Sequence, residues 1–175
     1  DAGVPFLGDD DGIQPIMGDQ VFLWDACRAV NGGEMPAFNW QLTGSCTHGG
    51  AHNALTVLTC NQIAALPTPA VFKIPFALPA YGESRRRFFG RDTEGEGSSG
   101  DLVALVLSEL GLTSVDHPSV PEADRPKVCG PALVYDRAVE LKYSAAKNCP
   151  PAVREACKNH KIKYEVIASL EQAER

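Results

Sequence analysis

Prolines and glycines interrupt this chain so often that it can fold only into short elements joined by many loops. The 175 residues include 16 glycines and 13 prolines, and both residue types end helices and strands. Apolar residues make up 44% and charged residues 22% of the chain, which is the balance of a globular protein with a packed core. We therefore expect one loop-rich domain over residues 1–175, in which residues 1–35 form an N-terminal extension with a short helix.

Charge and the length of the apolar runs restrict the partners of the chain. The 22 acidic and 16 basic residues give a formal net charge of −6, which disfavours binding to nucleic acid or to an anionic membrane surface. No run of the sequence approaches the roughly 18–20 apolar residues that a membrane-spanning helix needs. The sequence also lacks a phosphate-binding glycine motif and a serine-hydrolase elbow. We expect no nucleic acid, membrane or cofactor.

Apolar spacing predicts helices over most of the chain and a regular strand only near its C-terminal end. After Cys46, apolar residues recur at helical spacing until Pro67, which would end an amphipathic helix. Asp101 and Gly111 are suitable caps for a mainly apolar, buried helix. The other expected elements are a helix from Asp19 to Val30, a strand or extended segment at 71–76, helical turns at 81–89, a loop at 116–131, helices at 132–147 and 151–159, a strand at 162–166 and a final helix from Ser169. This order predicts a helix-rich α+β fold.

The segment before and after Cys46 has the layout of a thiol acyl-transfer site. Gly44 and Ser45 precede the cysteine, and the predicted helix begins there. A thiol in the first turn of a helix is close to the positive end of the helix dipole, and this favours the nucleophilic thiolate. Gln41 could donate a side-chain N–H to an oxyanion. The spacing alone favours the simpler interpretation of a buried cysteine at the start of a core helix.

These motifs resemble the papain-like cysteine peptidases between about residues 36 and 170. The matching parts are the approach segment 36–43, Gly44-Ser45-Cys46, and the glycine-rich stretch 97–100 that leads into a second apolar helix at 102–111. The segments 81–85 and 96–101 are similar to a divergent group found in bacteriophage and bacterial sequences. The resemblance implies the helix-rich left half of a papain-like fold, with a central cysteine-bearing helix and a short C-terminal strand.

The resemblance also implies a mechanism, from which this sequence departs at two points. Cys46 would attack an amide carbonyl, a histidine would act as general acid and base, and a glutamine would stabilise the oxyanion. In the family the glutamine lies six residues before the cysteine, but here that residue is Trp40, and Gln41 follows it. The family's histidine comes from a β-rich second half, which would follow Arg175.

Four histidines remain as candidates for a base or a metal site. His117, in the proline-rich loop, is the candidate base. His48 and His52 are four residues apart, point away from the Cys46 thiol on a helix and could bind zinc with Cys60, although packing histidines are the simpler interpretation. His160 lies near a helix end, where a structural or solvent-exposed role is expected. We therefore expect no resident metal.

The sequence leaves two main hypotheses for function. The first is a non-catalytic protein that reuses a papain-like fold as a structural or binding module, such as a bacteriophage virion protein, with other protein chains as partners. The second is an active papain-type thiol peptidase, with Cys46 as nucleophile and a base beyond this chain or in another chain. The displaced glutamine, the missing histidine and the Gly49-Gly50 pair in the cysteine helix favour the first. The six cysteines are expected to be mostly free thiols, with one or two disulfides if the compartment is oxidising.

Overall fold

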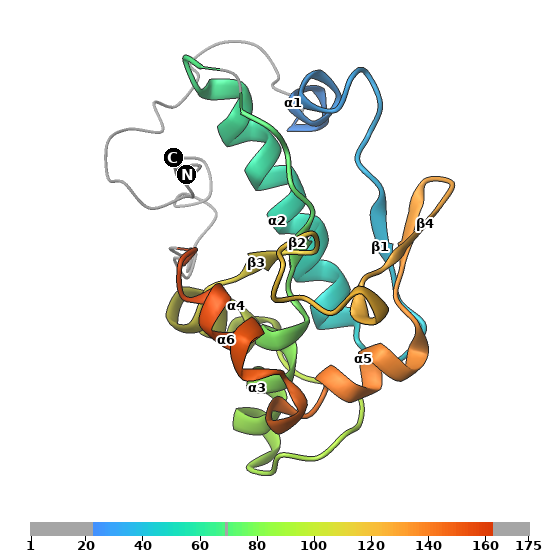
Figure 1. Ribbon diagram of the computed structural model, residues 1–175, viewed down its shortest axis with the longest axis vertical. Coiled ribbons are helices and arrows are strands. Elements are labelled where there is room, and N and C mark those ends of the chain that lie inside the picture. Colours follow the sequence, from blue (N-terminus) through green and yellow to red (C-terminus); the bar gives the residue numbers. More distant parts are fainter. Residues whose placement is uncertain (1–22, 69, 163–175) are drawn as a thin grey trace, which may run out of the picture.

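The computed structural model describes residues 23–68 and 70–162, and it has the α+β architecture expected from the sequence (Figure 1). The strand predicted at 162–166 and the final helix predicted from Ser169 lie outside the described residues, apart from Ile162. The elements in chain order are α1 (Leu23–Val30), β1 (Phe38–Trp40), α2 (Cys46–Ala65), β2 (Pro75–Phe76), α3 (Leu78–Phe89), α4 (Gly100–Leu110), β3 (Thr113–Ser114), η1 (Glu122–Asp124), β4 (Lys127–Cys129), β5 (Ala132–Val134), α5 (Arg137–Tyr143), η2 (Ala146–Asn148) and α6 (Pro151–Cys157).

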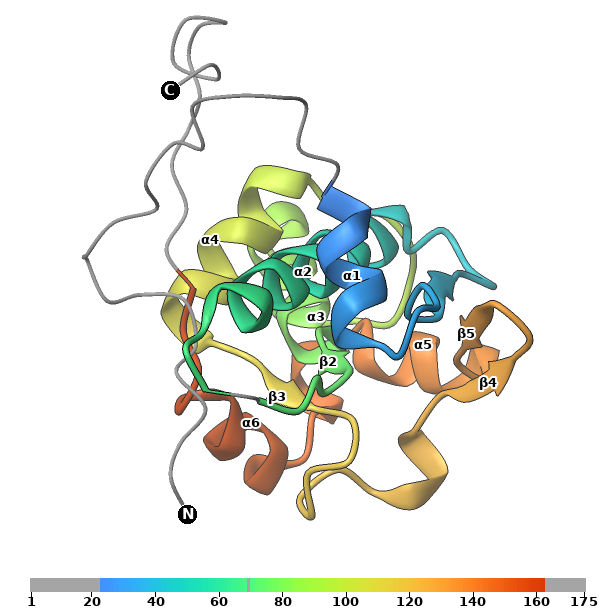
Figure 2. The same cartoon turned by 90° about the horizontal axis from the view of Figure 1, so that it is seen from above.

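Helix α2 is the central element, as the apolar spacing after Cys46 predicted. It runs for 20 residues and ends at Ala65, where the Leu66 N–H bonds the Ile63 carbonyl just before Pro67. Helix α1 lies across α2 (Figure 2), and the Asn61 side chain of α2 donates to the Leu23 carbonyl at 3.1 Å. The N-terminal end of α2 lies beside β1 and α5 (Figure 1).

Two small sheets connect segments that are far apart in the sequence. In the three-stranded sheet, β5 lies in the centre, parallel to β1 and antiparallel to β4. The prediction of a helix over 132–147 was therefore wrong for its first part. Gly130, with a φ of +60°, turns the chain between β4 and β5, and a helix begins only after Asp136 caps it by accepting from the Ala138 N–H at 2.8 Å. The loop predicted at 116–131 likewise contains η1 and β4.

Three other features differ from the predicted ones. Helix α4 is capped by Ser99 rather than Asp101, which lies in its first turn and accepts a hydrogen bond from the Ser99 hydroxyl. The sequence predicted that α4 would be buried, but only one of its faces is fully buried. Its opposite face is partly exposed to solvent. The extended segment 71–76 forms a strand only at its end, where β2 pairs with β3.

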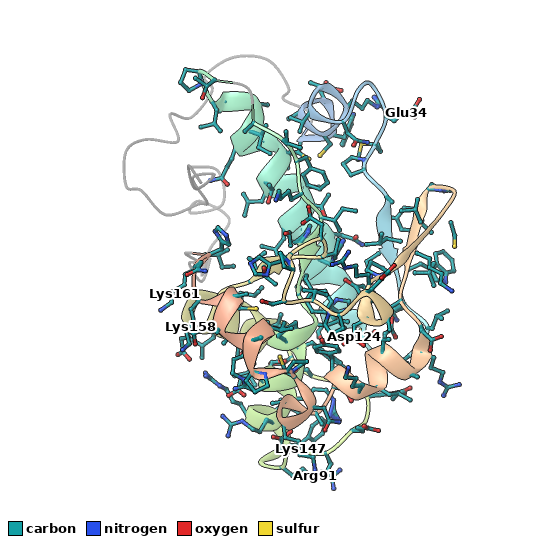
Figure 3. All side chains as sticks on the ribbon, in the orientation of Figure 1. Glu34, Arg91, Asp124, Lys147, Lys158 and Lys161 are labelled. Atoms are coloured by element: carbon teal, nitrogen blue, oxygen red, sulfur yellow. The ribbon has the colours of Figure 1, made fainter. Side chains whose placement is uncertain are left out.

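The core consists of two adjoining apolar clusters, one on each side of α3. The first is formed by α2, α3 and α4 and includes Leu55, Ala77, Ala80, Val103, Val106, Leu107, Leu112 and Ile162. The second lies between α3, α5 and α6 and includes Phe76, Leu78, Val120, Tyr135, Val139, Tyr143, Cys149, Val153 and Cys157. On its border, Asp124 of η1, labelled in Figure 3, accepts from Lys142 at 2.7 Å and from the Tyr143 hydroxyl at 2.9 Å. Helix α3 therefore determines how the two halves pack.

Gly82 marks the closest approach between α3 and the end of α5. A Cβ at this position would overlap the Tyr143 carbonyl oxygen, which is backbone and cannot move aside. We expect Gly82→Ala to lower the free energy of unfolding by about 2–3 kcal/mol, the usual scale for overpacking. Urea titration followed by circular dichroism would measure this loss.

Gly50→Ala is the matched control for that substitution. Gly50 is helical, and no atom lies within 4 Å of an added Cβ. Because alanine is the better helix former, this variant should be neutral or up to about 1 kcal/mol more stable than the wild type. Equal stability of the Gly82→Ala and wild-type chains would show that α3 and α5 do not meet so closely.

Candidate thiol site at the start of α2

Cys46 is the first residue of α2, as the sequence predicted, and its thiol is exposed. The alternative of a buried cysteine opening a core helix is wrong for this residue. The Ser45 side chain does not cap the helix; its hydroxyl instead lies 3.3 Å from the buried Glu140 carboxylate. The thiol is therefore close to the positive end of a long helix dipole, at the molecular surface.

Residues 81–85 and 96–101, which carry part of the papain-like resemblance, lie beside the Gly44-Ser45 pair that precedes Cys46. The Gly44 carbonyl accepts from the Gly97 N–H at 2.9 Å and from the Tyr81 hydroxyl at 3.5 Å. One turn along α3, the hydroxyls of Ser84 and Ser98 form a hydrogen bond of 2.7 Å. The loop before α4, the helix α3 and the start of α2 are therefore held in contact with one another, although the three segments are distant in the sequence.

Tyr81 lies close enough to Cys46 and Glu96 to interact with both electrostatically. Burial raises the pKa of Tyr81 to about 12, with nearby Arg85 opposing this shift and the Cys46 and Glu96 charges adding to it. The phenol is therefore protonated at neutral pH and acts as a hydrogen-bond donor. The Glu96 side chain lies against Gly44, where an added Cβ would be 2.8 Å from its Oε2. Neither group is the imidazole that a papain-like mechanism uses.

Glu140 of α5 anchors the segment that leads to Cys46, and sequence reasoning missed it. Its carboxylate accepts from the Thr43 hydroxyl at 2.6 Å, from the Ser45 hydroxyl at 3.3 Å and from the Leu42 N–H at 3.3 Å. The side chain is almost fully buried. No local pattern marks this glutamate, because its partners lie almost 100 residues earlier in the chain.

Gln41 lies against the first turns of α2, but the structure gives it no bond to the thiol. Its Oε1 would be 3.4 Å from a Cβ at Gly49, and the Asn39 Oδ1 would be 3.1 Å from the same position. Gly49 follows Cys46 by three residues and shares a helix face with it. Trp40, which occupies the family's glutamine position, is exposed on β1 instead.

His48 and His52 are fully buried behind the thiol, and among the described residues no partner meets hydrogen-bond geometry at their nitrogens, although the Pro75 carbonyl lies near His52. The ring of His48 packs at 5.6 Å from that of Tyr135 and at 6.1 Å from that of His52. Burial lowers the pKa of His48 to about 3, and the neighbouring His52 adds to this shift. Burial also lowers the pKa of His52 to about 4, although the Pro75 carbonyl partly opposes it. Both rings are therefore neutral packing groups at physiological pH.

His117 and His160 lie together near β3 and α6. The His117 Nδ1 accepts from the Ser119 N–H at 3.1 Å, and none of its described hydrogen bonds reaches Cys46. Burial lowers the pKa of His160, and the charges of His117 and Lys73 add to this effect. The structure thus places the candidate base His117 with His160 rather than with the thiol.

Within residues 23–68 and 70–162, no three histidine, cysteine or acidic side chains come together as a group that could hold a metal ion. The Cys60 of the possible zinc set instead faces Cys27 on α1. Over the same ranges, no helix is long and apolar enough to cross a membrane. Comparison with family models, with curated proteins and with solved structures gives no match for this chain.

Proposed function

We propose that this chain is a non-catalytic, protein-binding component of a larger assembly, such as a bacteriophage virion, built on the cysteine-bearing half of a papain-like fold. The observation that carries this proposal is an exposed aromatic surface on the three-stranded sheet. The rings of Phe38 and Trp40 lie 6.2 Å apart on β1, and Trp40 is 56% exposed. Large exposed apolar patches on a folded protein mark sites of protein interaction.

The register of the sheet extends this aromatic surface across β5. Phe38 pairs with Ala132 and Trp40 pairs with Val134, so these four side chains share the outer face. Asn39, between the two rings, points inward and is buried. We call Phe38, Trp40, Ala132 and Val134 the outer sheet face.

The outer sheet face favours a partner that docks on its surface rather than one that adds a strand to β1. The Asn53 side chain of α2 accepts a 2.7 Å hydrogen bond from the Asn39 N–H, which points away from β5. This contact occupies the edge donor that an added strand would need. A second protein chain with an apolar contact surface fits this arrangement best.

Self-association of the purified chain tests the proposal. We expect sedimentation velocity to show dimers or larger species whose proportion rises with concentration. Trp40→Lys should shift the distribution to monomer by placing a charge in the centre of the outer sheet face. Phe88→Lys is the matched control, because Phe88 is 53% exposed but lies on α3. A monomer at all concentrations, with measurable peptidase turnover, would contradict the proposal.

A second candidate function, a papain-type thiol hydrolase, is favoured by the exposure of Cys46 at the start of α2. If the helix start activates this thiol, iodoacetamide should label it below pH 8, and at least roughly ten times faster than Cys129. Cys129 is the matched control, because it is also exposed but lies on strand β4. Equal, slow labelling of both cysteines, measured by peptide mass spectrometry, would leave only the non-catalytic interpretation.

A further inference from the structure

We infer that Cys27 and Cys60 are a disulfide-forming pair that locks α1 onto α2. The two thiols come from different helices, and both side chains are completely buried. Such a crosslink would be a modification site separate from Cys46 and from the outer sheet face.

The contacts around Leu23 bring the two helices together at this point. The Leu23 carbonyl oxygen lies 3.6 Å from the Cys27 Sγ and accepts from the Asn61 Nδ2 at 3.1 Å. Asn61 follows Cys60 directly in α2, so the turn of α2 that carries Cys60 meets the turn of α1 that carries Cys27. The two thiols are close enough for a side-chain hydrogen bond to form between them.

Helix α1 depends on this contact because most of its surface is not covered by the core. Cys27 is its only fully buried residue, while Leu23 and Trp24 on the same helix are about half exposed. Neither apolar cluster of the core includes a residue of α1. A covalent bond at Cys27 would therefore keep α1 on α2 when the noncovalent contacts between the two helices break.

The oxidant is a small-molecule disulfide such as oxidised glutathione. One protein thiolate attacks a sulfur of the oxidant, forms a mixed disulfide and releases one glutathione thiolate. The second protein thiolate then attacks the protein sulfur of the mixed disulfide and releases the other. The two protein thiols lose two protons and two electrons in total, and two reduced glutathione molecules are formed.

The burial of both thiols determines when this reaction can occur. Burial raises the pKa of the Cys60 thiol to about 12, and the neighbouring Cys27 adds to the shift, so the docked pair contains little of the reactive thiolate. Exchange therefore takes place while α1 is undocked, above all during folding.

Cys149 and Cys157 provide a comparison within the same chain. Both lie in the cluster between α3, α5 and α6, and the Cys149 Sγ lies 3.7 Å from the Pro150 carbonyl oxygen. They belong to segments that the core already holds. The Cys149 charge adds to the raised pKa of Cys157, so these two thiols also lie near each other, and Cys149→Ala removes this second pair from the test.

The test is to refold the full chain from urea in a glutathione redox buffer and then to alkylate the remaining thiols with N-ethylmaleimide in denaturant. We expect a product two mass units lighter before alkylation, and a crosslinked peptide that joins Cys27 to Cys60. The oxidised chain should have a Tm on the order of 5 °C or more above that of the reduced chain. Cys27→Ser and Cys60→Ser should each abolish both changes, whereas Cys149→Ala should keep them.

The peptide map of the wild type keeps the inference testable even if a serine variant fails to fold. Full alkylation of both Cys27 and Cys60 after refolding under oxidising conditions would overturn the inference. A map in which either cysteine is joined mainly to a third one would do the same.

Discussion

Lowering the pH from 6.5 to 4 should reduce the stability of this protein by about 5 kcal/mol or more, a loss comparable to the whole stability of many domains. The cause is the pair of neutral histidines buried behind Cys46. Their folded-state pKa values are about 3 for His48 and about 4 for His52, well below the ordinary value of 6.5. Between these values and 6.5, the unfolded chain binds protons that the folded chain excludes.

The direction of the effect follows from this difference in bound protons. Above pH 6.5 both states are neutral at these histidines, and their contribution to stability is complete. As the pH falls toward 4, each histidine removes about 1.4 kcal/mol of stability per pH unit. Urea midpoints, measured by tryptophan fluorescence at half-unit steps from pH 7 to pH 4, would give the slope.

Substitution of a buried histidine would show whether it causes the pH dependence of stability. His48→Phe keeps a ring in contact with Tyr135 but removes one titrating group, so the pH slope should fall to about half. A stability that does not change between pH 7 and pH 4.5 would contradict the burial of these rings.

Loss of the stability that Glu83 contributes should begin at a lower pH than the loss caused by the histidines. Burial alone would raise its pKa, but hydrogen bonds and charges from Arg86, together with Arg154 and Arg87, outweigh this and lower it. Stability from Glu83 is therefore present above the ordinary glutamate range, near pH 4.5, and is lost below it. The two contributions can be separated by where on the pH scale each one disappears.

The parts of the fold that depend on local sequence were predictable. Helix α2 follows from helical apolar spacing between Ser45 and Pro67, and this spacing also places Cys46 in its first turn, although it did not predict that the thiol is exposed. Helix α6 begins at Pro151, the position where proline costs a helix nothing. In each case, neighbouring residues alone decide the backbone conformation.

The parts that depend on distant contacts were not predictable. A short apolar run such as Ala132–Val134 fits a strand or a helix equally well, and its pairing with β1, almost 100 residues earlier, makes it a strand. His48 and His52 showed metal-like spacing, but the packing of Tyr81 and Tyr135 around His48 made it a core residue. The role of Glu140 was missed for the same reason, since its partners in residues 42–45 lie almost 100 residues earlier in the chain.

Replacing Glu140 by alanine should destabilise the protein by about 3–5 kcal/mol, because it removes a buried, charged acceptor of three hydrogen bonds. The carboxylate is only 1% exposed and receives hydrogen bonds from Leu42, Thr43 and Ser45. Glu140→Gln keeps the size and one acceptor oxygen, but it turns an amide NH₂ toward groups that are themselves donors. It should therefore cost less, about 1–3 kcal/mol.

The loss should be concentrated at the start of α2, because Glu140 is what joins residues 42–45 to α5. Hydrogen exchange at residues 42–48 should accelerate in Glu140→Ala more than exchange in α6. Glu155→Ala is the matched control, since Glu155 is a glutamate on α6 that is 73% exposed and pairs with Lys158; it should change stability by less than about 0.5 kcal/mol. If Glu140→Ala were as stable as Glu155→Ala, the carboxylate would not hold the segment before Cys46, and the position of the thiol would have to depend on the contacts of Gly44 with Gly97 and Tyr81.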